Sequence, residues 1–207
     1  QEQQNNNQYE YGFIDSAADT FGVGGKAWVI DTITDRKVQV AGYHSVDTVM
    51  NDIPIGSAIT AVDLPNQQTI LLRANEATIM GENANSLFSV PQMLENNVEV
   101  QDKSRRHGGK AYIECEGIII PLTLVDAMMT IKIRRPTKYE LDNCEMVGIT
   151  SPEPWHPYEL NEEENSEMSE EEYNNFVDNI EKRNINNRKT QNVVENPDKY
   201  APYFLYP

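Results

Sequence analysis

Cysteine is scarce in this sequence of 207 residues, which contains only Cys115 and Cys144. Two cysteines without paired spacing, in a chain with no Asn-x-Ser/Thr glycosylation site, do not make a disulfide framework. With 39% hydrophobic residues, the chain is long enough to bury a core without one. We therefore expect an intracellular, cytoplasmic protein that folds around an ordinary hydrophobic core.

Long apolar runs and an excess of basic residues are also missing. The longest apolar cluster, residues 118–122, is far shorter than the roughly 18 residues that a membrane-spanning helix needs. Seventeen Lys and Arg against 33 Asp and Glu give a net charge of −16, which opposes binding to DNA or RNA. Residues 1–8 lack the basic and apolar parts of a signal peptide. The sequence therefore predicts no membrane contact, no nucleic-acid partner and no signal peptide.

Residues that bind metals or nucleotides are sparse as well. His44, His107 and His156 are isolated from one another and from both cysteines, so we expect no metal site and no Cys/His nucleophile. The Gly-rich residues 21–26 end in a lysine, but the Gly and the Ser or Thr that a phosphate loop requires around them are absent. We interpret this segment as a turn before a strand, and we expect no cofactor.

The residue pattern over residues 9–150 is typical of an all-β protein. Short runs of β-branched and aromatic residues are broken by Gly, Asn, Asp and Pro about every eight to twelve residues. The predicted strands cover residues 11–14, 26–31, 37–43, 58–62, 69–74, 77–80, 98–100, 111–114, 118–124 and 128–133. Residues 64–68, between two of them, are typical of a hairpin tip.

Both ends of the chain are polar. Residues 1–8 are a Gln/Asn tract that cannot bury apolar surface, so we expect a disordered lead-in. Thirteen of the 33 acidic residues follow residue 150, and residues 151–157 are typical of a rigid proline-rich linker. We therefore place a boundary near residue 150 and expect an acidic, largely flexible tail over residues 151–207.

One short helix is predicted within this tail. Ser169 and Glu172 have the spacing of a capping box. The apolar residues that follow at helical spacing are Tyr173, Phe176, Val177 and Ile180. This pattern predicts an amphipathic helix near residues 170–183, whose apolar stripe packs either on its own domain or in the groove of a partner.

One predicted strand runs into residues that suit a rigidly held carboxylate. Residues 11–14 are followed by Asp15, Ser16, Ala17, Ala18 and Asp19. A carboxylate at the end of a buried strand, followed by a hydroxyl group and a small residue, can be fixed while another molecule approaches closely. The same residue types also form ordinary turns. The pattern by itself leaves a catalytic site and a plain turn both open.

Residues 15–19 resemble the Asp-Ser/Thr-Gly-Ala-Asp motif of retropepsins, the aspartic proteases of retroviruses and retrotransposons. Further segments follow in an order similar to copia-type retrotransposon polyproteins of diatoms and related protists. These segments are residues 38–43, 52–72, 85–94, 117–122, 134–141 and 149–157. The resemblance spans about residues 13–157, and its order is more specific than any single segment.

The resemblance implies an all-β, retropepsin-like (acid protease) barrel over residues 9–96, with an additional β extension over residues 97–150. It implies an aspartic endopeptidase that processes a Gag-Pol-like polyprotein in the cytoplasm or within virus-like particles. Because each chain of such an enzyme supplies one catalytic Asp, it also implies a homodimer. By resemblance, Asp15 and Ser16 are catalytic. The substrate-binding residues implied are Ala17, Ala18 and Asp19, with Leu64, Pro65, Asn66, Gln67 and Gln68 in a flap that closes over the peptide.

Ala17 departs from the motif, which has Gly at this position. Its methyl group would narrow the cleft between substrate backbone and protein. One alternative is therefore a non-catalytic binding or assembly module, in which the retropepsin fold holds a peptide and the tail recruits a partner. Another is a structural segment of the polyprotein between its capsid and integrase regions.

Overall fold

The computed structural model describes residues 8–42, 49–158 and 168–195. The chain divides into two units, Gln1–Pro157 and Tyr158–Pro207. Strands dominate the first unit, and the second contains the helix α4 (Glu170–Glu195). Residues 1–7 of the predicted lead-in and residues 159–167 of the predicted tail lie outside the described residues.

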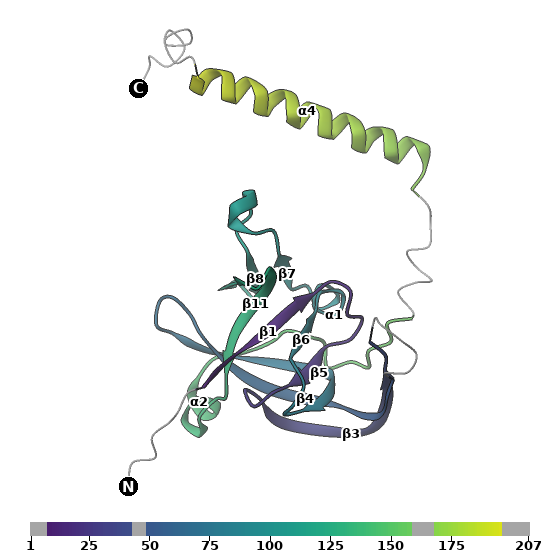
Figure 1. Ribbon diagram of the computed structural model, residues 1–207, viewed down its shortest axis with the longest axis vertical. Helices are drawn as coiled ribbons and strands as arrows, with labels where there is room; N and C mark the ends of the chain where they lie inside the picture. Colours follow the sequence, from purple (N-terminus) through teal and green to yellow (C-terminus); the bar gives the residue numbers. More distant parts are fainter. Residues whose placement is uncertain (1–7, 43–48, 159–167, 196–207) are drawn as a thin grey trace. The chain divides into compact units, whose positions relative to one another are not determined.

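Most strands of the first unit belong to one mixed sheet (Figure 1). It contains β1 (Tyr9–Asp15), β2 (Gly22–Gly24), β3 (Val29–Val40), β4 (Met50–Asp63), β5 (Thr69–Gly81), β6 (Leu87–Ser89), β10 (Thr123–Val125), β11 (Met128–Arg134) and β12 (Met146–Gly148). A separate antiparallel sheet contains β7 (Glu99–Gln101), β8 (Tyr112–Cys115) and β9 (Ile118–Pro121). The short helices are α1 (Val90–Glu95), the 3-10 turn η2 (Arg105–His107) and α2 (Lys138–Asn143). The prediction of an all-β fold class is confirmed at this level.

The strand order of the large sheet brings distant segments together. Its neighbours run β10-β11-β1-β6-β2-β5-β4-β3, with β12 added beside β5. The pairs β1–β6, β2–β5 and β12–β5 are parallel, and the other pairs are antiparallel. Strand β11 also meets β4, where Arg134 lies opposite Ala61. The strands from β11 to β4 therefore form a closed ring. Strands β10, β11 and β12, which follow residue 97 in the chain, belong to the same sheet as β1.

Several predicted strands have different limits in the structure. Residues 29–31 of one predicted strand and 37–40 of the next belong to one strand, β3, whose side chains are almost all exposed and therefore show no alternation. Residues 69–74 and 77–80 are likewise one strand, β5, interrupted by an irregular pairing with β4. Strands β2, β6 and β12 were not predicted, because three residues are too few to show a period of two.

An aromatic cluster forms part of the hydrophobic core. Phe21, Trp28 and Phe88 are buried, and their ring centroids lie 4.6–6.0 Å apart. Gly12 of β1 packs against this cluster, because a Cβ atom there would lie only 2.2 Å from Cε2 of Phe88. The glycine thus lets β1 pass close to the aromatic core.

Helix α4 begins at the position that the capping box predicts. The Glu172 carboxylate accepts from the Ser169 backbone N–H over 2.8 Å, and the Ser169 hydroxyl accepts from the Glu172 N–H over 3.3 Å. The helix runs on to Glu195, beyond the predicted end. Tyr173 and Phe176 are each more than half exposed. Among the described residues, no helix is both long enough and apolar enough to cross a membrane.

Candidate functional site

Asp15 is the last residue of β1, at the point where this strand lies parallel to β6. In this pairing Asp15 lies opposite Ser89, and the Phe13 N–H donates to the Ser86 carbonyl over 2.9 Å. The side chain of Asp15 is half-buried. The carboxylate therefore sits on a strand fixed by neighbours on both sides, since β11 pairs with the other edge of β1.

The Asp15 loop (residues 16–20) is held mainly by hydrogen bonds from outside the loop. One Asp15 carboxylate oxygen accepts from the Ala17 N–H over 2.8 Å. The Ser89 hydroxyl donates to the Ala18 carbonyl over 2.7 Å. The Trp155 indole N–H donates to the Asp19 carbonyl over 2.9 Å. These bonds fix the loop backbone while leaving Ser16, Ala17 and Asp19 exposed.

Helix α1 supplies two of the anchors at this site. Ser89 is its N-cap, and the Ser89 hydroxyl also accepts from the Gln92 N–H over 3.2 Å. Gln92 is 2% exposed, and its side-chain oxygen accepts from the Phe21 N–H over 2.7 Å. This helix was not predicted from the sequence, although Ser89 followed by Pro91 is a typical helix start.

Trp155 is a further anchor of the Asp15 loop, after Ser89 and Gln92, that was not predicted from the sequence. It belongs to residues 151–157, which were predicted to be a linker. In the structure this segment reaches the Asp15 loop through the indole group and reaches β5 through the Trp155 backbone N–H, which donates to Glu76 over 3.1 Å. The sequence gives no local signal for this contact, because Trp155 and Asp19 are 136 residues apart.

The structure brings residues 15–19 together, but it does not bring residues 64–68 to them. Residues 64–68 form the tip of the β4–β5 hairpin, where the Leu64 N–H donates to the Gln68 carbonyl over 2.8 Å. The base of this tip contacts Tyr9, the first residue of β1, whose hydroxyl donates to Asp63 over 2.8 Å. From Tyr9 to Asp15, β1 spans about 20 Å at the usual rise of a strand. The predicted flap residues therefore lie at the opposite end of β1 from Asp15 within this chain (Figure 1).

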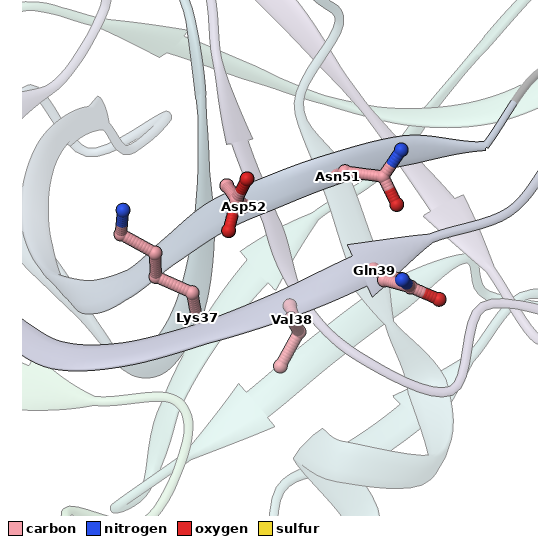
Figure 2. A pocket seen from close by; sticks show the side chains of 5 residues that line it. All are labelled: Lys37, Val38, Gln39, Asn51 and Asp52. Atoms are coloured by element: carbon pink, nitrogen blue, oxygen red, sulfur yellow. The ribbon is translucent and has the colours of Figure 1, made fainter.

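A different hairpin is linked to the Asp15 loop through Glu76 and Trp155. Strands β3 and β4 form a long antiparallel hairpin whose described part ends at residues 42 and 49. Arg36 of β3 forms an ion pair with Glu76, the residue that accepts from Trp155. A hollow of about 540 Å³ is lined by residues of both arms, namely Lys37, Val38, Gln39, Asn51 and Asp52 (Figure 2). Its lining is mostly polar and comes only from this hairpin.

Comparisons with protein families, with curated proteins and with solved structures find no match. A functional conclusion therefore rests on the geometry of this chain.

The Gly-rich segment 21–26, predicted to be a turn before a strand, contains the short strand β2, and a bend at residues 25–27 leads from it towards β3. Gly25 has a φ angle of 78°, which glycine adopts without strain. The backbone N–H groups of Lys26 and Ala27 donate to the carboxylate of Glu10 over 3.0 and 3.2 Å. The donors that would face a phosphate are thus already occupied by a side chain of β1.

Cysteine and metal chemistry receive no support from the described residues. Burial raises the pKa of the Cys115 thiol to about 11, so this thiol is protonated near neutral pH. No group of three or more His, Cys, Asp or Glu side chains gathers within the described ranges. Of the candidates considered, Asp15 and its loop have the most extensive anchoring.

Proposed function

We propose that this chain is one half of an aspartic endopeptidase of the retropepsin type, which acts as a homodimer and processes a retrotransposon Gag-Pol-like polyprotein. The observation that carries the proposal is the position of Asp15. It ends a strand held between β11 and β6, and it leads into an exposed loop whose carbonyl groups are anchored by Ser89 and Trp155. This arrangement agrees with the motif that residues 15–19 resemble.

The chemistry needs two carboxylates in contact. Two carboxylates about 3 Å apart cannot both be ionised, so they share a proton. One then activates a water molecule as a base, while the other donates a proton to the peptide carbonyl. The second carboxylate is Asp15 of another copy, which is why the proposal requires a homodimer. Ser16 braces the pair, and Ala17, Ala18 and Asp19 line the cleft.

A closed ring of paired strands supports the proposal that the fold is a retropepsin-like barrel. The ring runs through β11, β1, β6, β2, β5 and β4 and closes where Arg134 meets Ala61. The β3–β4 hairpin extends from this ring and is linked to the Asp15 loop through Arg36, Glu76 and Trp155, whereas the base of the 64–68 tip contacts Tyr9 at the other end of β1. We therefore assign gating of the cleft to the β3–β4 hairpin.

A non-catalytic binding or assembly module is the second candidate. The exposed Ala17 favours it, because its methyl group occupies space that Gly would leave to the substrate backbone. In that case the barrel holds a peptide without cleaving it.

Cleavage of a peptide library at mildly acidic pH tests the proposal. The unmodified protein should cut peptides, and a transition-state-mimicking inhibitor of aspartic proteases should block this activity. Asp15→Asn should abolish cleavage while leaving the fold intact, since an amide cannot alternate between base and acid. Asp126→Asn is the matched control, because Asp126 is exposed in the β10–β11 turn and has a positive φ angle that Asn tolerates.

The pH profile and the oligomeric state complete the test. The rate should follow a bell-shaped curve in the acidic range, with two macroscopic pKa values that belong to the pair. Sedimentation should show a dimer. Undiminished cleavage by Asp15→Asn would contradict the assignment, and a dimer without any cleavage would favour the binding module.

A further inference from the structure

Residues 151–157, which we call the strap, connect two parts of the molecule through Trp155. The indole N–H donates to the Asp19 carbonyl over 2.9 Å, and the backbone N–H donates to the Glu76 carboxylate over 3.1 Å. The first contact is on the Asp15 loop and the second is on β5. Trp155, which is not part of any strand, thus links the Asp15 loop to the large sheet.

Glu76 is itself held by several elements. Its φ angle of 49° is unusual for a residue other than glycine, and it lies where β5 pairs irregularly with β4. Such a backbone persists only where its surroundings fix it. Here the Glu76 carbonyl accepts from the side chain of Gln92 over 3.2 Å, and its side chain, 11% exposed, is paired with Arg36.

Three anchors hold the backbone at residues 18, 19 and 21, within and directly after the Asp15 loop. Ser89 binds the Ala18 carbonyl, Trp155 binds the Asp19 carbonyl, and the Gln92 side chain binds the Phe21 N–H. Ser89 and Gln92 are buried within the first unit, so the packing around them fixes their side chains. Trp155 is only partly buried and depends on Glu76 for its second bond.

We propose that Trp155 and Glu76 are positioning residues of the candidate active site: the strap holds the Asp15 loop in its working geometry. The role in cleavage rests on the proposed function, whereas the ordering of the loop does not. A shared-proton pair requires each carboxylate to be held within a fraction of an ångström. Through Arg36, Glu76 also ties the β3–β4 hairpin to the same strap.

The experiment compares variants that remove one contact at a time. Trp155→Phe keeps an aromatic ring and removes the indole donor. Glu76→Gln keeps a side-chain oxygen that can accept from the Trp155 backbone N–H, but it removes the negative charge that faces Arg36. Tyr112→Phe is the matched control, because it removes an exposed aromatic hydrogen bond to Glu99 in the three-stranded sheet. Kinetic constants and amide hydrogen exchange are measured on all four proteins.

Hydrogen exchange reports on the loop without any need for activity. The Ala17 and Phe21 N–H groups are both bonded in the structure, so their exchange reports opening of the loop. In Trp155→Phe we expect their exchange to become about three- to tenfold faster, which corresponds to the loss of one hydrogen bond. Glu76→Gln should accelerate exchange in β3 and, to a smaller extent than Trp155→Phe, at Ala17 and Phe21; unchanged exchange at these two N–H groups would remove Glu76 from the proposal. Tyr112→Phe should leave both regions unchanged.

Kinetics then separate positioning from binding. Trp155→Phe should lower kcat by about tenfold with little change in KM, since a misplaced catalytic group affects the transition state more than the ground state. Exchange at Ala17 and Phe21 that stays equal to that of Tyr112→Phe would overturn the proposal. Faster exchange with unchanged kcat would also overturn it. If the unmodified protein cuts no peptide, the proposed function fails, and exchange alone decides whether the strap orders the loop.

Discussion

Arg134 holds Asp63 with two parallel hydrogen bonds, from Nε to Oδ2 and from Nη2 to Oδ1, each 2.7 Å long. The same guanidinium donates to Glu140 over 2.7 Å, and its side chain is only 4% exposed. These bonds from Arg134 hold the pKa of both carboxyl groups below their usual values. The cluster fastens the base of the β4–β5 hairpin to β11 and α2.

This cluster predicts a loss of stability in acid. A carboxyl group whose pKa is lowered by folding stabilises the protein above its unfolded pKa, near 4, and this contribution is lost as the pH falls below that value. We expect the free energy of unfolding, measured with urea, to decrease between pH 6 and pH 3. Asp63→Asn should cost about 1–3 kcal/mol at pH 6 and weaken this pH dependence. Asp126→Asn should behave like the unmodified protein, and equal pH dependence in all three proteins would contradict the prediction.

Ser89→Ala should affect both the fold and the candidate site. It removes the bond to the Ala18 carbonyl and the cap of α1, so we expect a loss of about 1–2 kcal/mol in urea denaturation. Thr137→Ala is the matched control, because Thr137 caps α2, a helix of the same length that is anchored elsewhere. Both variants should lose stability, but only Ser89→Ala should reduce kcat for peptide cleavage. Equal kcat values for the two variants would argue against a role of Ser89 at the site.

Ala17→Gly tests whether the methyl group limits activity. If the methyl group narrows the cleft, the variant should have a higher kcat/KM, because the substrate backbone can approach more closely. Its free energy of unfolding should fall by about 0.5–1 kcal/mol, because Gly loses more chain entropy on folding. A dimeric Ala17→Gly protein that cuts no peptide of a broad library at acidic pH would favour the binding module.

Truncation after Pro157 should leave the fold of the first unit intact. The apolar residues Tyr173, Phe176 and Ile180 of α4 are 58%, 57% and 41% exposed, so little buried surface depends on them. We expect the melting temperature of residues 1–157 to lie within a few degrees of that of the full chain. Loss of cooperative melting on truncation would show instead that the helix is part of the core.

The local features of this protein could be predicted from its sequence. Short runs of β-branched and aromatic residues, broken by frequent turn residues, predicted an all-β fold, because strand propensity and turn chemistry act over a few residues. The capping box at Ser169 marked the start of α4 for the same reason. Residues 15–19 were also identified locally, as a strand that ends in an acidic and hydroxyl-containing turn.

The surroundings of Asp15, in contrast, depend on contacts between distant parts of the chain. Ser89 and Trp155 reach this loop from 71 and 136 residues away, and no local pattern encodes such distances. The tip at residues 64–68 lies at the far end of β1, because Asp63 at its base accepts a hydrogen bond from Tyr9. Sequence patterns report which face of an element is apolar, whereas side-chain hydrogen bonds depend on which elements the core brings together. The anchoring of the candidate site is therefore a property of the fold.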